Sequence, residues 1–316
     1  MVVALLFAGL LTGEIGAKLV RGRDAKGILP QPAVHLPPQP IWPEDARHQF
    51  EDFEKGLAEK PFEALDTEDL KKNIFISNTI LSSWLTSLVL IGIFVIGASR
   101  LRLVPRGLQN LCEMVVEALL NFVEGVVGKE WGRRLFPVIA TIFLFVALNA
   151  WMGLLPIYPS LGIFKWDGHG WELTGHLLRP AGTDLNMPLA LALVSFGFVE
   201  LCGLRALGFR YIGKFVRVRD LLRLPPRPTG LIDAFTGVLE AFSEFIRIIS
   251  FTFRLFGNMT AGEILVLVMT FLIPLVATVA VYGLEILIGF IQAMIFAGLT
   301  LVFASMALTS HAAEEH

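Results

Sequence analysis

The chain has 316 residues, of which 54% are hydrophobic and 17% are charged, and its formal net charge is −2. An ordinary soluble domain carries about 45–50% apolar and about 25% charged residues, so this composition excludes a soluble domain and indicates a membrane protein. The two cysteines lie in apolar helical sequence, which excludes a disulfide framework. The sequence contains no Gly-rich phosphate loop, no group of zinc ligands and no nucleophile motif. It therefore predicts no cofactor, no metal site and no nucleic-acid partner.

The first 77 residues differ from the rest of the chain. Residues 2–12 form an apolar run that is too short for a membrane span and lacks a basic start and a clear cleavage site. Residues 1–26 therefore have three interpretations: an N-terminal anchor, an uncleaved signal or a peripheral helix. Residues 27–77 begin with a proline-rich stretch, typical of an extended linker, and continue as an acidic segment. We interpret them as an aqueous extension without catalytic residues.

Residues 78–316 are expected to form the membrane domain. Three continuous apolar runs, each close to the ~20 residues that cross a hydrocarbon core, occur at 78–98, 135–155 and 187–207. Residues 108–127 are amphipathic and carry three glutamates, which predicts a helix at the membrane interface. The mostly apolar sequence of residues 229–310 predicts a long helical hairpin. The expected fold class is therefore an all-α polytopic membrane protein with about five membrane helices and an interfacial amphipathic helix.

Lysine and arginine residues gather in three loops, at 100–106, 129–134 and 205–227. The positive-inside rule places such loops in the cytoplasm, and the three placements agree with a single threading of the chain. The same threading places the loop at 157–186 on the opposite side and the C-terminus in the cytoplasm.

The predicted hairpin has an unusually long first arm, from about Leu231 to Leu272, followed by a turn near Pro274. Roughly 40 helical residues measure ~60 Å, about twice the thickness of a hydrocarbon core. Ordinary tilts average ~20°, so this arm must be strongly tilted, broken or lying partly across the membrane. The second arm is expected at 281–308.

Arg254 lies well inside this apolar hairpin. A guanidinium at membrane depth costs ~2.5–3.5 kcal/mol on insertion scales and cannot lose its charge. Arg254 must therefore face protein or water, and an ionisable residue at such depth indicates a functional site. The alternative is an arginine near a helix end whose charged head reaches the interface.

Carboxylates lie on both sides of this arginine along the first arm. Glu240 precedes Arg254 by about four turns, within ~40° of the same face and ~21 Å away, and Asn258 is its neighbour one turn on. Glu263 lies half a turn round and ~13–14 Å further along. Neither carboxylate can therefore form a direct intrahelical ion pair with Arg254.

The returning arm adds Glu285 and Gln292 on one face, ~10 Å apart. An antiparallel hairpin about Pro274 puts Glu285 level with Glu263, and Arg254 level with Gln292 or a neighbour. Two carboxylates at one depth are stable together only when they share a proton, which is the property that a proton relay needs.

Structural interpretations of these polar residues remain open. Paired membrane carboxylates can also join helices, and the amides of Asn258 and Gln292 can bridge them. We interpret Ser243 and Ser250 as packing residues rather than parts of a water chain.

The residues around Arg254 resemble a known family. The string Arg-Leu-Phe-Gly-Asn-Met-Thr-Ala-Gly-Glu at 254–263, with Ile-Gln-Ala-Met-Ile-Phe at 291–296, is similar to subunit a of the rotary F-type ATP synthases. The Gly-Leu-Leu-Pro string at 153–156, the segment at 183–193 and the terminal Glu-Glu-His also resemble that family. The similarity covers roughly 78–316.

The resemblance implies a stator subunit that conducts protons to and from a rotating ring of c subunits through two offset half-channels. The family's indispensable arginine matches Arg254, and its inner half-channel acid matches Glu240. Its remaining pathway positions match polar residues of the outer half-channel and of the mouth of the third span: Asn258, Glu263, Glu285, Gln292, Asp184 and Asn186.

The chain departs from some bacterial members at two positions. Gly153 stands where they carry an acid, and Glu285 stands where they carry a histidine. The outer pathway of this chain is therefore expected to depend more on Glu263 together with Glu285.

The resemblance also implies partners and a location. The expected partners are the c-subunit ring, the b subunits of the peripheral stalk, the rest of the synthase and the lipid bilayer, with no catalytic site on this chain. The expected location is the bacterial inner membrane, and an organellar energy-transducing membrane is the alternative. The sequence leaves open whether the coupling ion is H⁺ or Na⁺.

Two other classes of function fit the sequence less well. A secondary transporter, with Arg254 binding an anionic substrate, would predict internal repeats with paired broken helices, and the segment around Arg254 has no second copy. A purely structural scaffold would leave the order of carboxylate, arginine and carboxylate unexplained.

Overall fold

The structure is a computed structural model that describes residues 18, 40–42, 76–99, 102–155, 158, 161–166, 171–208 and 230–309. The apolar run at 2–12 and most of the 27–77 extension lie outside the described residues, so the interpretations given for them stay predictions.

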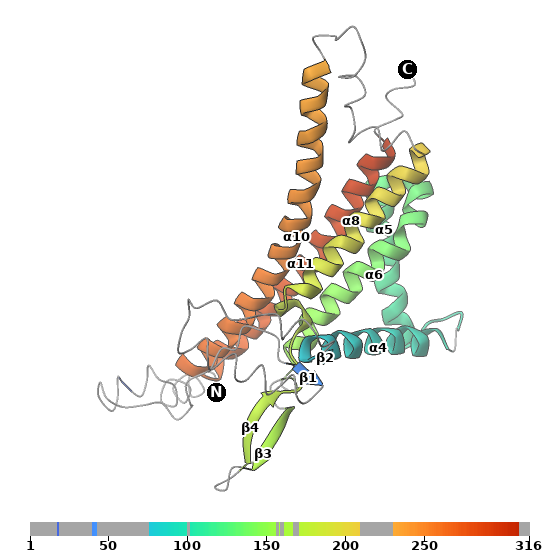
Figure 1. Ribbon diagram of the computed structural model, residues 1–316. Coiled ribbons are helices and arrows are strands. Elements are labelled where there is room, and N and C mark those ends of the chain that lie inside the picture. The colour runs from blue at the N-terminus through green and yellow to red at the C-terminus, as the bar shows by residue number, and fades with distance from the viewer. Residues whose placement is uncertain are drawn as a thin grey trace. The chain divides into compact units, whose positions relative to one another are not determined.

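Long helices make up most of the described chain (Figure 1). They are α4 (Asn78–Ala98), α5 (Leu108–Val127), α6 (Lys129–Gly153), α8 (Asn186–Leu207), α10 (Gly230–Leu272) and α11 (Val276–Thr309). All of them except α5 are long and apolar enough to cross a membrane. This confirms the predicted all-α polytopic membrane fold with five apolar helices and an amphipathic sixth.

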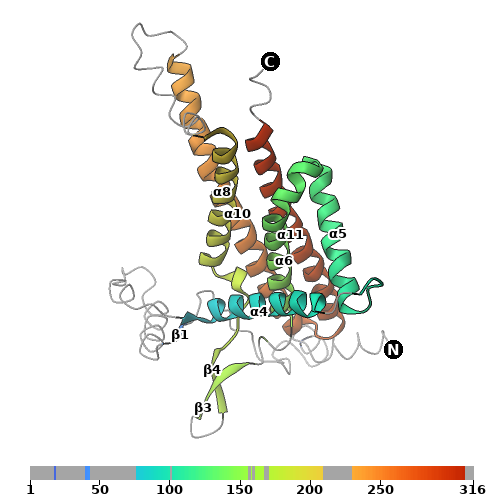
Figure 2. The same ribbon diagram turned by 90° about the vertical axis from the view of Figure 1, so that its right-hand side faces the viewer.

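Two short antiparallel sheets accompany the helices. The strands are β1 (Pro40–Trp42) paired with β2 (Ile76–Ser77), and β3 (Gly162–Trp166) paired with β4 (Trp171–His176). The β3–β4 hairpin, which extends beyond the end of α6 in both views (Figure 2), is followed by the short 3₁₀ helix η2 (Ala181–Thr183). The segment expected to be only a loop at 157–186 therefore contains regular structure.

The junction of α5 and α6 depends on one glycine. Gly128 has a φ of +81°, a backbone conformation that glycine adopts without strain, and its N–H donates to the Glu124 carbonyl oxygen. The chain reverses there and α6 starts directly at Lys129, six residues before the expected start of this span. Arg133 in the first part of α6 returns to Glu124, with Nε 3.3 Å from Oε1.

The predicted helical hairpin is present. Its first arm, α10, has 43 residues, which correspond to ~65 Å, and matches the expected bounds closely. The turn includes Pro274 and Leu275, whose φ of +73° is uncommon for a residue with a side chain. The second arm, α11, begins at Val276, five residues earlier than expected. The Thr278 hydroxyl donates to Thr270 Oγ1 across the turn at 3.4 Å.

The chain divides into two compact units, each composed of interleaved segments. The first unit comprises 1–92, 145–184 and 256–291, and the second comprises 93–144, 185–255 and 292–316. Each arm of the hairpin therefore contributes one part to each unit. The tip of the hairpin, from 256 to 291, belongs wholly to the first unit.

The core of the second unit forms where α10, α11 and α8 pack together. The ring centroids of Phe251 and Phe296 are 4.8 Å apart, and Phe251 is 6.2 Å from Phe303. The hydroxyls of Ser195 on α8 and Thr300 on α11 are hydrogen-bonded at 2.7 Å and buried. A polar pair inside an apolar core joins helices only because each hydroxyl is satisfied.

Candidate functional site

The polar residues singled out in the sequence divide between the two units. The first unit holds Asp184, Asn258, Glu263 and Glu285, and the second holds Asn186, Glu240, Arg254 and Gln292.

Arg254 is half-buried on α10 in the second unit. Its guanidinium carbon lies 6.0 Å from the centroid of the buried Phe251 ring, at the outer limit of a cation–π contact. The structure gives Arg254 no ion pair with any carboxylate in the described part of this unit. Its positive charge is therefore not neutralised there.

Arg247, a second arginine on α10, has different surroundings from Arg254. Arg247 lies two turns before Arg254, on nearly the same face. Its Nη1 is 2.6 Å from Oε2 of the buried Glu244, and its guanidinium carbon is 3.6 Å from the centroid of Phe303. Arg247 is thus compensated inside the protein by a carboxylate and an aromatic face. Sequence reasoning missed Glu244, although its i,i+3 spacing to Arg247 was available.

The other predicted residues of the second unit occupy different environments. Gln292 is buried, with 2% of its surface exposed, next to the fully buried Ala293. Glu240 is half-buried on α10, four residues before Glu244. Asn186, the first residue of α8, is exposed. The uncharged amide of Gln292 costs less to bury than an ionised carboxylate would.

In the first unit, Glu285 of α11 meets the backbone of α10. Glu285 is buried, and its carboxyl group lies so close to Gly262 that a Cβ on that glycine would be 2.6 Å from Glu285 Cδ. Gly262 and Glu285 are nearly equidistant from Pro274, as are the bonded Thr270 and Thr278. The antiparallel register expected from the sequence is therefore present at the tip of the hairpin.

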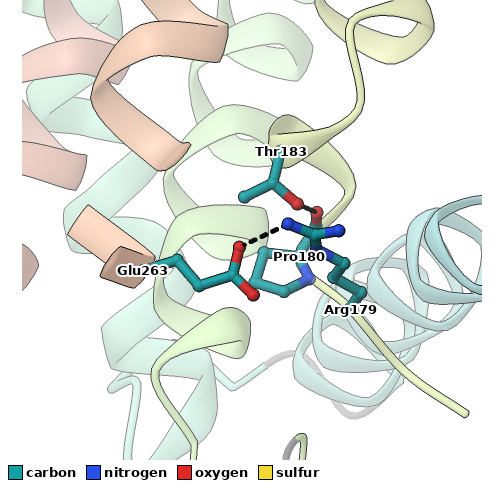
Figure 3. Close-up of polar contacts among 4 residues, drawn as sticks. All are labelled: Arg179, Pro180, Thr183 and Glu263. Carbon is teal, nitrogen blue, oxygen red and sulfur yellow. Dashed lines mark hydrogen bonds and ion pairs between the residues drawn. The ribbon is translucent and has the colours of Figure 1, made fainter. Parts of the chain in front are cut away.

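Glu263 has a partner that the sequence did not indicate. Nη2 of Arg179 lies 2.9 Å from Oε2 of Glu263, and Figure 3 shows the guanidinium directed toward this carboxylate. The shared proton predicted between Glu263 and Glu285 stays a prediction, and the structure adds a cation to one of the two carboxylates. The only sequence signal for Arg179 is that a carboxylate in an apolar helix needs a counter-charge.

The segment that carries Arg179 is fixed by its own hydrogen bonds. The Thr183 hydroxyl donates to the Pro180 carbonyl oxygen at 2.8 Å (Figure 3). Asp184, predicted at the mouth of the third span, is buried and accepts a hydrogen bond from Thr79 Oγ1 of α4 at 2.9 Å. Thr79 in turn is bonded to Ser77 at 2.8 Å. Asp184 therefore holds the end of this segment to the start of α4.

Asn258, the remaining residue of the first unit, is exposed on α10. It lies four residues after Arg254 along the same helix, so both side chains emerge from one face.

The chain is similar to known proteins of one family. A family model described as "ATP synthase A chain" matches residues 80–305. The chain is 34% identical over 233 residues to the ATP synthase subunit a of Gloeobacter violaceus, covering 74% of this chain and 84% of that protein. It is 31% identical over 222 residues to the ATP synthase subunit a of Helicobacter acinonychis and of Helicobacter pylori, covering 70% of this chain and 85% of theirs.

Proposed function

Because the chain belongs to the ATP synthase A chain family, the proton-channel component of F-type ATP synthases, we propose that it is the stator subunit that couples proton flow to rotation of a c-subunit ring. The chain is a multi-pass membrane protein, and its partner is the rest of the synthase. Within that complex, the proposal assigns it the ring and the b subunits of the peripheral stalk as direct neighbours.

Two offset half-channels carry the protons in this proposal. The inner one includes Glu240. The outer one is lined by polar residues of the hairpin and of the start of α8: Asn258, Glu263, Glu285, Gln292, Asp184 and Asn186. Arg254 stands between the half-channels and faces the ring carboxylate as it passes. A potential of 100 mV supplies ~2.3 kcal/mol per proton, and the offset of the channels converts it into rotation in one direction.

The contrast between the two arginines of α10 supports this role most directly. Arg247 has a carboxylate 2.6 Å away, whereas Arg254 has none in the described part of its unit. An uncompensated guanidinium in an apolar helix is costly, and an anion supplied by a partner lowers that cost. A ring carboxylate is such an anion, and it must lose its proton to form the pair.

The permanent charge of Arg254 also explains the separation of the half-channels. A guanidinium cannot accept a further proton or release one at physiological pH, so it blocks direct passage between the two pathways. In this arrangement a proton crosses only by binding to the ring and travelling with it.

The proposed location is the bacterial inner membrane, with the C-terminus in the cytoplasm. The basic loops that determine this threading follow the positive-inside rule. The similar proteins from Gloeobacter and Helicobacter are bacterial.

The proposal is tested by reconstituting the synthase that contains this chain into vesicles. ATP should drive proton uptake that a protonophore collapses, and the initial rate should not depend on sodium. Uptake that requires sodium would show that sodium, not the proton, is the coupling ion. ATP hydrolysis without transport of either ion would contradict the proposal.

A further inference from the structure

An ion pair joins Glu263, a residue of the proposed outer pathway, to Arg179, which has no role in that pathway so far. The two side chains are 8% and 27% exposed, and the contact is 2.9 Å. A guanidinium keeps its charge, and the ion pair holds the carboxylate of Glu263 in a fixed direction. A carboxylate held in this way is poorly suited to bind and release a proton in every cycle.

The loop that presents Arg179 is packed tightly between two helices of the first unit. A Cβ added to Gly153, at the end of α6, would lie 2.6 Å from Pro180 Cγ. A Cβ added to Gly182 would lie 2.8 Å from Met259 Cγ, and Met259 is one turn before Glu263 on α10. The loop therefore rests on the same face of α10 that carries Glu263, and the position of Arg179 is determined by packing.

The second carboxylate at this level has a different environment. Glu285 of α11 is buried, and its carboxyl group lies against Gly262, the residue before Glu263. Within the described part of the first unit, the titratable and charged groups near Glu263 include Arg179 from the loop and Glu285 from α11. Asp184 lies at the end of the loop and is bonded to Thr79 of α4. In the part of the chain that the structure describes, Glu263 is the one of the two glutamates that pairs with a cation.

We propose that Arg179 is a positioning residue of the outer pathway, a fixed counter-charge that holds the Glu263 carboxylate in one place and leaves Glu285 as the group that takes up and releases protons. This inference rests on the proposed function and assigns different roles to the two carboxylates. It predicts that proton transport is impaired when only one of Arg179 and Glu263 is neutralised. It also predicts that transport does not need Glu263 as a proton carrier.

The test compares single and paired neutral variants in the reconstituted synthase. Arg179→Gln and Glu263→Gln each leave one charge of the pair without the other and should slow ATP-driven pumping by at least about tenfold. The double variant Arg179→Gln with Glu263→Gln removes both charges and should return to within about threefold of the wild-type rate. Arg179→Lys, which keeps the charge, should retain more activity than Arg179→Gln.

The pH–rate profile gives a readout that a purely structural role would not change. Arg179→Gln should change the shape of the wild-type profile, and the double variant should restore it. Arg133→Gln is the matched control, because it removes an exposed arginine from an ion pair with Glu124 and should leave rate and profile unchanged.

Two results separate failure of this inference from failure of the proposed function. If the double variant pumps as slowly as Glu263→Gln, while Arg254→Ala does not pump at all, Glu263 is an obligatory carrier and the inference is wrong. If Arg254→Ala pumps normally, the proposed function itself is wrong. The comparison of the double variant with Glu263→Gln remains decisive even where Arg179→Gln alone fails to assemble.

Discussion

The carboxyl group of Glu285 lies directly against the backbone of Gly262, with no space for a methyl group between them. The arm α11 thus carries the buried Glu285, and the arm α10 carries a glycine at the same level. This close approach places the acid of α11 next to the residue that precedes Glu263 on α10.

Substituting Gly262 should displace the Glu285 carboxyl. A Cβ at position 262 would lie 2.6 Å from Glu285 Cδ, so Gly262→Ala forces this side chain to move. We expect ATP-driven pumping to fall severalfold while the complex still assembles. Gly283→Ala is the control, because a Cβ there meets nothing within 4 Å. Equal rates in the two variants would show that the position of Glu285 does not matter for transport.

Glu263 and Glu285 should not behave as independent sites. Because both belong to the proposed outer pathway, the double substitution to Gln should slow proton transport much less than the product of the single effects. The measurement is the initial pumping rate of the two single variants and the double variant in matched vesicles. Losses that multiply would assign the two carboxylates to separate structures.

Glu244 is expected to matter for stability rather than for transport. Glu244→Gln removes the carboxylate that compensates Arg247, leaving a charge beside Phe303. We expect a loss of about 1–3 kcal/mol in the free energy of unfolding, seen as a lower Tm of the purified complex in detergent. Ser243→Ala, at the exposed neighbouring position, is the control. An unchanged Tm together with abolished pumping would instead show that Glu244 takes part in the inner proton pathway.

Glu240 should be reached from the cytoplasm. With Cys112 and Cys202 replaced, a cysteine near 240 should react with a membrane-impermeant thiol reagent from the cytoplasmic side, and a cysteine near 263 from the opposite side. Glu240→Gln should slow proton exchange on the cytoplasmic side alone. Labelling of both cysteines from one side would contradict offset half-channels in this chain.

The helices were predictable because their signals are local. The bounds of α4 and α5 match the sequence interpretation residue for residue, since an apolar run and an amphipathic run end beside basic or glycine residues. The start of α11 was placed too late because the apolar residues just after Pro274 suit a wide turn as well as a helix. The β3–β4 hairpin was missed because strands of five or six residues give only a short alternating pattern.

The site was predictable only in part. Spacing along a helix and reflection about the turn placed Glu285 beside α10, because both depend on regular geometry. The partner of Glu263 is 84 residues away in a loop, and no periodicity relates Arg179 to it. The same limit applies to Asp184 and Thr79, which are 105 residues apart and meet only through tertiary packing.

Arg254 provides the most direct test of the account. ATP synthesis driven by a proton gradient should be measured in vesicles that contain the synthase with Arg254→Ala, Arg254→Lys or the wild-type chain. We expect normal assembly with no coupled synthesis for Arg254→Ala, and severe impairment for Arg254→Lys, because the planar fork of the guanidinium is lost. Near-normal synthesis by Arg254→Ala would contradict the central claim that a fixed charge at this position couples proton flow to rotation.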